Sequence, residues 1–142
     1  MPQLVDLDWK HYKPRHPTGV PGSYPRSPLD IVDNPALFRK MDPECLFFAF
    51  YFQPATYQQF LAAHELKRQS WRFHKQHNAW FQRFTEPSVT SDEYEQGAYV
   101  YFDYNIVHDD MQTGWCYRRK ENFTFRLVEG GAGWFWGRAV LG

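Results

Sequence analysis

The hydrophobic pattern of this chain changes its period once, close to Ser70, and this change limits the possible folds. Before Ser70, Pro35 follows two candidate capping residues, Asp33 and Asn34, and Pro43 follows Asp42, as at the start of an α-helix. After Ser70, aromatic and polar residues alternate over residues 71–74 and 98–104, as in β-strands. In the second segment, odd-numbered and even-numbered side chains are expected on opposite faces. Helices followed by consecutive short strands predict an α+β fold, with short N-terminal helices followed by a small bent antiparallel β-barrel.

The chain is expected to have three parts. Six of its ten prolines lie in the first 28 residues, and proline opposes helix formation. Residues 1–33 are therefore expected to form an extended arm, which either docks on a partner or is only a disordered linker. Residues 34–129 are expected to form one domain, with helices over 35–69 and the barrel over 70–129. Residues 130–142 are expected to form a loose tail rich in Gly and Trp.

The segment 46–52 is apolar on every side. Periodicity cannot separate a buried helix from a buried strand here, and the helix start at Asp42-Pro43 favours a helix. The helix is either entirely core, or one side packs inward and the other meets a second chain. An aromatic content of 20% supports a surface shared with another chain. The candidate interface residues are Leu37, Phe38, Leu46, Phe47, Phe50 and Tyr51.

Charges are balanced overall but separated along the chain. Sixteen Lys and Arg residues are balanced by sixteen Asp and Glu residues, which excludes a net-basic nucleic-acid domain as the default. Five basic residues and no acid lie between Lys67 and Arg83, and seven acids lie between Arg83 and Arg118. Residues 86–95 are expected to form a solvated acidic loop. One interpretation is a surface for single-stranded RNA, made of Lys67, Arg68, Arg72, Lys75, Trp80 and Arg83. The alternative, which neutral net charge favours, is that the two blocks face each other within the barrel or across a protein interface.

No residue pattern indicates an enzyme or a metal site. His74 and His77 are three residues apart, but no Cys-x-x-Cys pair or third close ligand accompanies them. His74 is instead expected on the polar face of its strand. Phosphate-binding, nucleotide-binding and serine-nucleophile motifs are absent from the sequence. We therefore expect no catalytic residues, no metal and no cofactor.

The two cysteines, Cys45 and Cys116, cannot form a disulfide scaffold. Cys45 lies in an apolar run and is expected to be a buried free thiol, which fits a reducing compartment such as the cytoplasm or nucleus. The longest apolar run is too short to span a bilayer. The first residues lack the basic and apolar regions of a signal peptide, so no membrane association is expected.

Several consecutive motifs resemble a known family. They are LFFAFYF (46–52), YQQFLAA (57–63), LKRQSWRFHK (66–75), WFQR (80–83), DEYEQG (92–97), YVYFDY (99–104) and FTF (123–125). In this order they resemble the NOT-box domain at the C-terminus of the third (in yeast, fifth) NOT subunit of the carbon-catabolite-repression–NOT complex, an mRNA deadenylase. The resemblance covers about residues 35–128.

The resemblance implies short helices followed by an Sm-like or SH3-like bent barrel without catalytic activity. It implies pairing with the NOT-box domain of the second NOT subunit, and docking of the arm on the C-terminal domain of the large NOT scaffold subunit. The complex would recruit repressor proteins and act in mRNA decay, translational repression and transcription regulation, in cytoplasm and nucleus. Weak affinity for uridine-rich RNA is also implied. Members of the family are longer chains with an N-terminal coiled coil, so we expect this chain to be part of a longer subunit.

Overall fold

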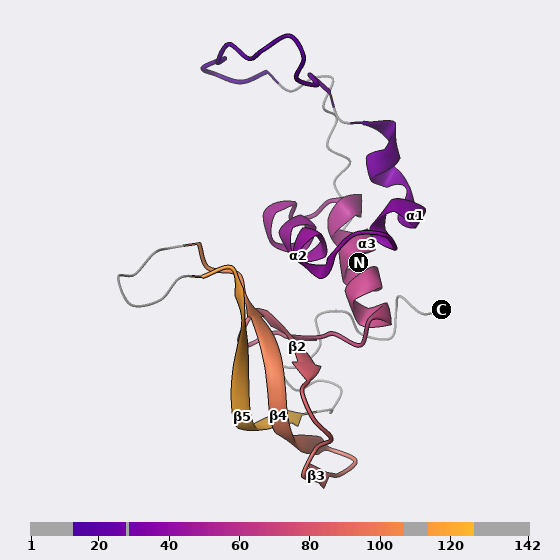
Figure 1. Ribbon diagram of the computed structural model, residues 1–142, viewed down its shortest axis with the longest axis vertical. Helices are drawn as coiled ribbons and strands as arrows, with labels where there is room; N and C mark the ends of the chain where they lie inside the picture. The colour runs from indigo at the N-terminus through magenta and orange to yellow at the C-terminus, as the bar shows by residue number, and fades with distance from the viewer. Residues whose placement is uncertain (1–12, 28, 107–113, 127–142) are drawn as a thin grey trace. The chain divides into compact units, whose positions relative to one another are not determined.

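The computed structural model describes residues 13–27, 29–106 and 114–126 (Figure 1). Contacts divide the chain into two compact units, Met1–Leu66 and Lys67–Gly142. The first is helical and the second contains the sheet. The expected tail over 130–142 lies outside the described residues.

The arm contains no helix or strand over residues 13–27, and all of its described side chains there are exposed. The helical unit then begins with a short 3-10 helix, η1 (Asp30–Asp33), followed by α1 (Pro35–Phe38), α2 (Pro43–Phe52) and α3 (Tyr57–Arg68). The backbone N–H of Ala36 donates to Oδ1 of Asn34 at 2.9 Å, which caps α1. Both α1 and α2 have proline in their first turn, as the sequence predicts.

Gln59 connects α3 to the end of α2. Its backbone N–H donates to Oγ1 of Thr56 at 3.2 Å, and its side-chain Oε1 accepts from the backbone N–H of Ala55 at 2.9 Å. The Gln59 Nε2 donates to the carbonyl oxygen of Phe50 at 2.9 Å. This reciprocal capping satisfies donors that the first turn of α3 would otherwise leave unpaired.

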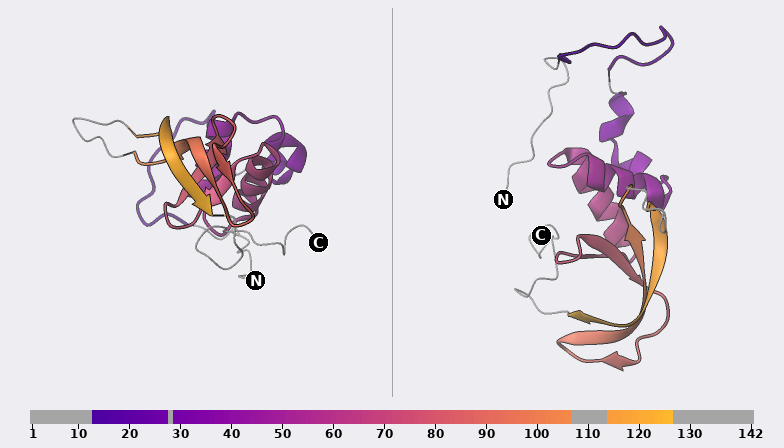
Figure 2. Two further views of the ribbon diagram at one scale, coloured as in Figure 1. Left: turned by 90° about the horizontal axis from the view of Figure 1, so that it is seen from below. Right: turned by 90° about the vertical axis from the view of Figure 1, so that its left-hand side faces the viewer.

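The second unit contains one antiparallel sheet. Its strands are β1 (Arg72–His74), β2 (Ala79–Arg83), β3 (Val89–Thr90), β4 (Tyr94–Asp103) and β5 (Cys116–Arg126). β1 pairs with β2, and β4 pairs with β2, with β3 and with β5. Figure 2 shows β4 and β5 as long curved ribbons. The α+β class is therefore confirmed, and β3 with the start of β4 lies where the sequence predicted a solvated loop.

Closure into a barrel is not confirmed. Among the described residues, β1 and β5 do not pair, so the sheet is open. β1 has three residues and β3 has two, which provides few backbone groups to complete a closed sheet. The curvature predicted from the short strands is present, but closure is not.

A register shift between Gly97 and Tyr99 bends the β4–β5 pair. Opposite the shift, Asn122 has a φ of 51°. A side chain at position 97 would also be crowded, because a Cβ there would lie 3.1 Å from the Cα of Pro87. Glycine therefore allows the chain before β3 to pass close to β4.

One face of the sheet carries an aromatic cluster, which we call the inner face. It comprises Ala79, Phe81, Tyr99, Phe123 and Phe125, with Tyr101 packed against it. The rings of Phe81 and Phe123 stack with centroids 4.8 Å apart. The register pairs Phe81 with Tyr101, so the alternation predicted for residues 98–104 is correct.

Two burial predictions are wrong. His74 is buried and contacts the rings of Phe81, Phe123 and Phe125, because the register places it beside Ala79 on the inner face. Cys45 is exposed instead of buried. It lies on α2 three residues before Phe48, which is also exposed, and i, i+3 positions share one side of a helix.

In the described part of the chain, no helix is long and apolar enough to cross a membrane.

Candidate functional site

The basic and acidic blocks meet on the inner face of the sheet. Glu95, on β4, is fully buried and forms ion pairs with Arg72 of β1 and Arg83 of β2. The register explains this meeting, since Arg83 pairs with Tyr99 and side chains two apart on β4 share a face. A buried carboxylate is stable only with such partners. Glu95 was expected in a solvated loop and is instead the centre of a charge cluster that joins three strands.

A second pair repeats this arrangement between β4 and β5. The Nε of Arg118 donates to Oδ2 of Asp103 at 2.8 Å. The backbone N–H and the Nδ2 of Asn105 both donate to Oδ1 of Asp103. Burial opposes ionisation of Asp103, but the hydrogen bonds from Arg118 and Asn105 outweigh it, so the pKa of this carboxyl lies below its ordinary value. The interpretation in which opposite charges face each other within the sheet is therefore supported.

The candidate RNA residues do not form one exposed surface. Arg72 and Arg83 are engaged with Glu95. Trp80 is fully buried and packs edge-on against Phe73 at 5.3 Å, so its ring is not available for a base. Lys67 and Arg68 end α3 and Lys75 follows β1. Burial lowers the pKa of the Lys67 ammonium.

The candidate interface residues divide between buried and partly exposed positions. Phe38, Leu46, Phe47 and Phe50 are buried within this chain, whereas Leu37 and Tyr51 are half-buried.

The exposed aromatic residues of the helices are others, which sequence reasoning missed. Phe48 is 52% exposed and Phe52 is 43% exposed, and their ring centroids are 5.0 Å apart. On α3, Tyr57 is exposed and stacks on Phe60 at 6.0 Å. We call Phe48, Phe52 and Tyr57 the exposed aromatic set. The four-residue spacing of Phe48 and Phe52 is the sequence signal that could have identified their shared side.

His74 and His77 lie close together in the sheet unit. The rings of His74 and His77 lie 4.5 Å apart, and the backbone N–H of His77 donates to Nδ1 of His74 at 3.4 Å. Burial, together with the positive charge of nearby Lys120, lowers the pKa of both imidazoles. Within residues 13–27, 29–106 and 114–126, no group of three His, Cys, Asp or Glu side chains is placed to hold a metal ion.

Comparisons with known proteins agree with the motifs. The family described as NOT2/NOT3/NOT5 C-terminal matches residues 1–129. General negative regulator of transcription subunit 3 of Schizosaccharomyces pombe is 44% identical over 116 residues, which cover 82% of this chain and 17% of that protein. Subunit 5 of Saccharomyces cerevisiae is 40% identical over 72 residues, 48% of this chain and 12% of that protein.

Subunit 2 of Saccharomyces cerevisiae is also similar, with 44% identity over 63 residues that cover 42% of this chain and 33% of that protein. The chain therefore spans a third or less of the length of these relatives. The matched region includes both the helices and the sheet with its Glu95 cluster. The chain belongs to the family of NOT2/NOT3/NOT5 C-terminal domains.

Proposed function

We propose that this chain is a non-catalytic pairing module of a NOT complex and that it binds the NOT-box domain of the second NOT subunit. Family membership supports this proposal, since its relatives are named as negative regulators of transcription or as NOT transcription complex subunits. In this role the chain positions other subunits and supports mRNA deadenylation, translational repression and transcription regulation, in the cytoplasm and the nucleus.

The exposed aromatic set is the observation that supports this proposal. Phe48 and Phe52 present adjacent rings to water, and exposed apolar clusters mark protein interfaces. Covering the exposed half of each ring would contribute about 1 kcal/mol. Half-buried Leu37 and Tyr51 would border this contact. The buried residues Phe38, Leu46, Phe47 and Phe50 would support it from beneath.

The arm has a separate proposed role. We assign it to the C-terminal domain of the large scaffold subunit, because its described residues are exposed and carry apolar side chains, including Val20 and Tyr24. Extended segments of this kind bind by placing apolar side chains on a partner surface. Repressor proteins would then bind the assembled complex.

The pairing proposal is tested by replacing Phe48 and Phe52 with Glu, singly and together. The double variant is expected to weaken co-purification with the second subunit's NOT box at least tenfold, because two carboxylates would have to be desolvated. Phe84→Glu is the matched control. Phe84 is exposed to the same extent, at 51%, but lies in the sheet unit.

Circular dichroism and thermal melting verify that each variant remains folded. Phe52→Gln provides a milder change on the same side of α2. Unchanged pairing by a folded double variant refutes the assignment of this surface.

A further inference from the structure

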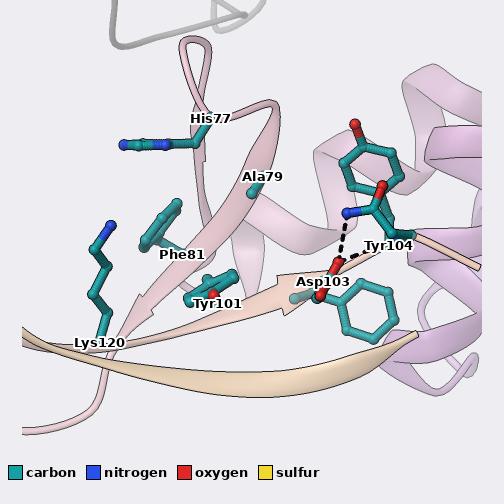
Figure 3. A pocket seen from close by; sticks show the side chains of 9 residues that line it. His77, Ala79, Phe81, Tyr101, Asp103, Tyr104 and Lys120 are labelled. Atoms are coloured by element: carbon teal, nitrogen blue, oxygen red, sulfur yellow. Dashed lines mark hydrogen bonds between the residues drawn. The ribbon is translucent and has the colours of Figure 1, made fainter. Parts of the chain in front are cut away.

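A pocket of about 190 Å³ lies at one end of the inner face of the sheet (Figure 3). Its lining comes from the turn after β1, from β2, β4 and β5, and includes His77, Phe81, Tyr101, Asp103 and Lys120. All of these residues belong to the second unit, and none belongs to the exposed aromatic set of the helices.

The floor of the pocket is aromatic and rigid. The rings of Phe81 and Tyr101 stack with centroids 5.3 Å apart and an interplanar angle of 27°. Phe81 also stacks on Phe123, with centroids 4.8 Å apart. Phe81 is therefore held in place, whereas Tyr101 is half-buried and accessible from the pocket. Such a floor favours an apolar or aromatic group.

The rim of the pocket carries the positive charge of Lys120. Arg72, Arg83, Arg118 and Arg119 each form an ion pair with a carboxylate. Lys120 is exposed and lies over the ring of Phe123, with its Nζ 5.0 Å from the centroid. Among the described residues it forms no ion pair. Figure 3 shows Lys120 and His77, which line the pocket together with Phe81.

Two other polar groups of the pocket, the Asp103 carboxylate and the Tyr104 hydroxyl, already have hydrogen-bond partners. Asp103 accepts from Arg118 and Asn105, and the hydroxyl of Tyr104 accepts from Nδ2 of Asn78 at 3.1 Å. The charge of Lys120 also lowers the pKa of His77, after burial, which keeps that imidazole neutral near pH 7. Among the residues that the structure describes, the lining thus combines an aromatic floor with one exposed cation, Lys120.

We propose that this pocket binds a short acidic segment of a partner protein, with one large apolar or aromatic side chain against the half-buried ring of Tyr101 and a neighbouring carboxylate at Lys120. Its volume favours a single side chain, because small-molecule sites enclose about 300–1,000 Å³. An RNA strand would need several cations for its phosphates. The arginines of the sheet named above are paired with carboxylates, so the charge favours a peptide.

This site is independent of the proposed pairing through the helices. The pocket lies in the sheet unit and the pairing surface in the helical unit. A variant of Lys120 is expected to pair normally, and a variant of Phe48 is expected to bind the peptide normally. The two proposals therefore fail separately.

The test uses the full 142-residue chain, labelled with ¹⁵N, and the synthetic peptide acetyl-Glu-Trp-Glu-Glu-amide. Titration is expected to shift the amide signals of Phe81, Tyr101 and Lys120 to saturation. Lys120→Glu is expected to weaken binding at least tenfold, and Tyr101→Leu several-fold. Arg119→Glu is the matched control, because neighbouring residues of a strand point to opposite faces, and it is expected to change binding less than twofold.

Two further peptides separate the contributions of charge and ring. Replacing the glutamates by lysines, or the tryptophan by alanine, is expected to weaken binding at least fivefold. The proposal is refuted if Lys120→Glu binds the peptide as tightly as the unchanged chain does. It is also refuted if no binding is seen at millimolar peptide, or if the shifted amide signals lie elsewhere in the chain. Saturation of the same signals by oligo(U), with no effect of the acidic peptide, would assign the pocket to RNA and also overturn it.

Discussion

Glu95 and Arg72 form an ion pair across the sheet, although they lie 23 residues apart in the sequence. The carboxylate is fully buried, whereas the side chain of Arg72 is 31% exposed. Arg83 neutralises the same carboxylate from β2. One buried acid therefore contacts two cations, and together these three side chains link three strands.

Replacing Glu95 by Gln is expected to lower the free energy of unfolding by about 2–4 kcal/mol, because removing one partner of a buried ion pair leaves the others uncompensated. Arg83→Gln should cost less, since Arg72 still neutralises Glu95. Urea denaturation measures both. Glu121→Gln is the control, as its pair with Arg119 is exposed and should contribute less than about 1 kcal/mol. A loss for Glu95→Gln no larger than that of the control would contradict this role.

The sequence predicted where the helices and strands lie better than it predicted which of their side chains are buried. Helix starts at Pro35 and Pro43 and the alternation of β4 followed from local rules, because capping and period depend on neighbouring residues. The burial of Glu95 and His74 depends on which strand lies opposite, and no local pattern carries that information. Whether β1 and β5 pair, and so close the sheet into a barrel, likewise depends on residues that are distant in the sequence.

The helices show a second limit of sequence reasoning. When every side of a helix is apolar, as in α2, hydrophobic periodicity cannot show which side faces water. The candidate interface therefore included buried Phe47 and Phe50 and omitted exposed Phe48 and Phe52. The charge blocks were more informative, since one of their two interpretations matches the pairing of Arg72 and Arg83 with Glu95 in the sheet.

The stability of the sheet is expected to depend on pH through His74. Burial, and then the charges of His77 and Lys120, lower the pKa of its imidazole below the ordinary histidine value of 6.5. As the pH falls below 6.5, the unfolded chain therefore binds more protons at His74 than the folded chain does. The free energy of unfolding is highest above pH 6.5 and decreases as the pH falls from 6.5 to the lower pKa of the folded state. Urea denaturation at pH 7.5 and 5.0 measures this loss.

His74→Phe is expected to reduce this pH dependence, because it removes the titrating group from among Phe81, Phe123 and Phe125. His64→Gln, at an exposed position of α3, is the control and should leave it intact. Asp103 does not account for the effect, because its pKa lies below 3.8. An unchanged pH dependence in a folded His74→Phe variant would exclude His74 as its source.

Cys45 is expected to report on pairing through α2. Its thiol is exposed, whereas Cys116 is only partly so, and native protein should therefore react with iodoacetamide faster at Cys45. Because Cys45 precedes Phe48 by three residues on α2, binding of the second subunit's NOT box should slow its alkylation at least fivefold. Mass spectrometry of the alkylated peptides measures both rates. Equal rates with and without a bound partner would place the contact elsewhere.

Binding to single-stranded RNA is expected to be weak and to depend little on Arg72 and Arg83. Both guanidinium groups pair with Glu95, which weakens their attraction for phosphates. Trp80 is buried, so its ring is not available for stacking on a base. Fluorescence anisotropy with labelled oligo(U) across a salt series measures the number of phosphates contacted. A slope of log K against log salt shallower than about −3 is expected. A steep slope that Lys75→Gln leaves unchanged and Arg83→Gln abolishes would show that the Glu95 cluster opens to bind RNA.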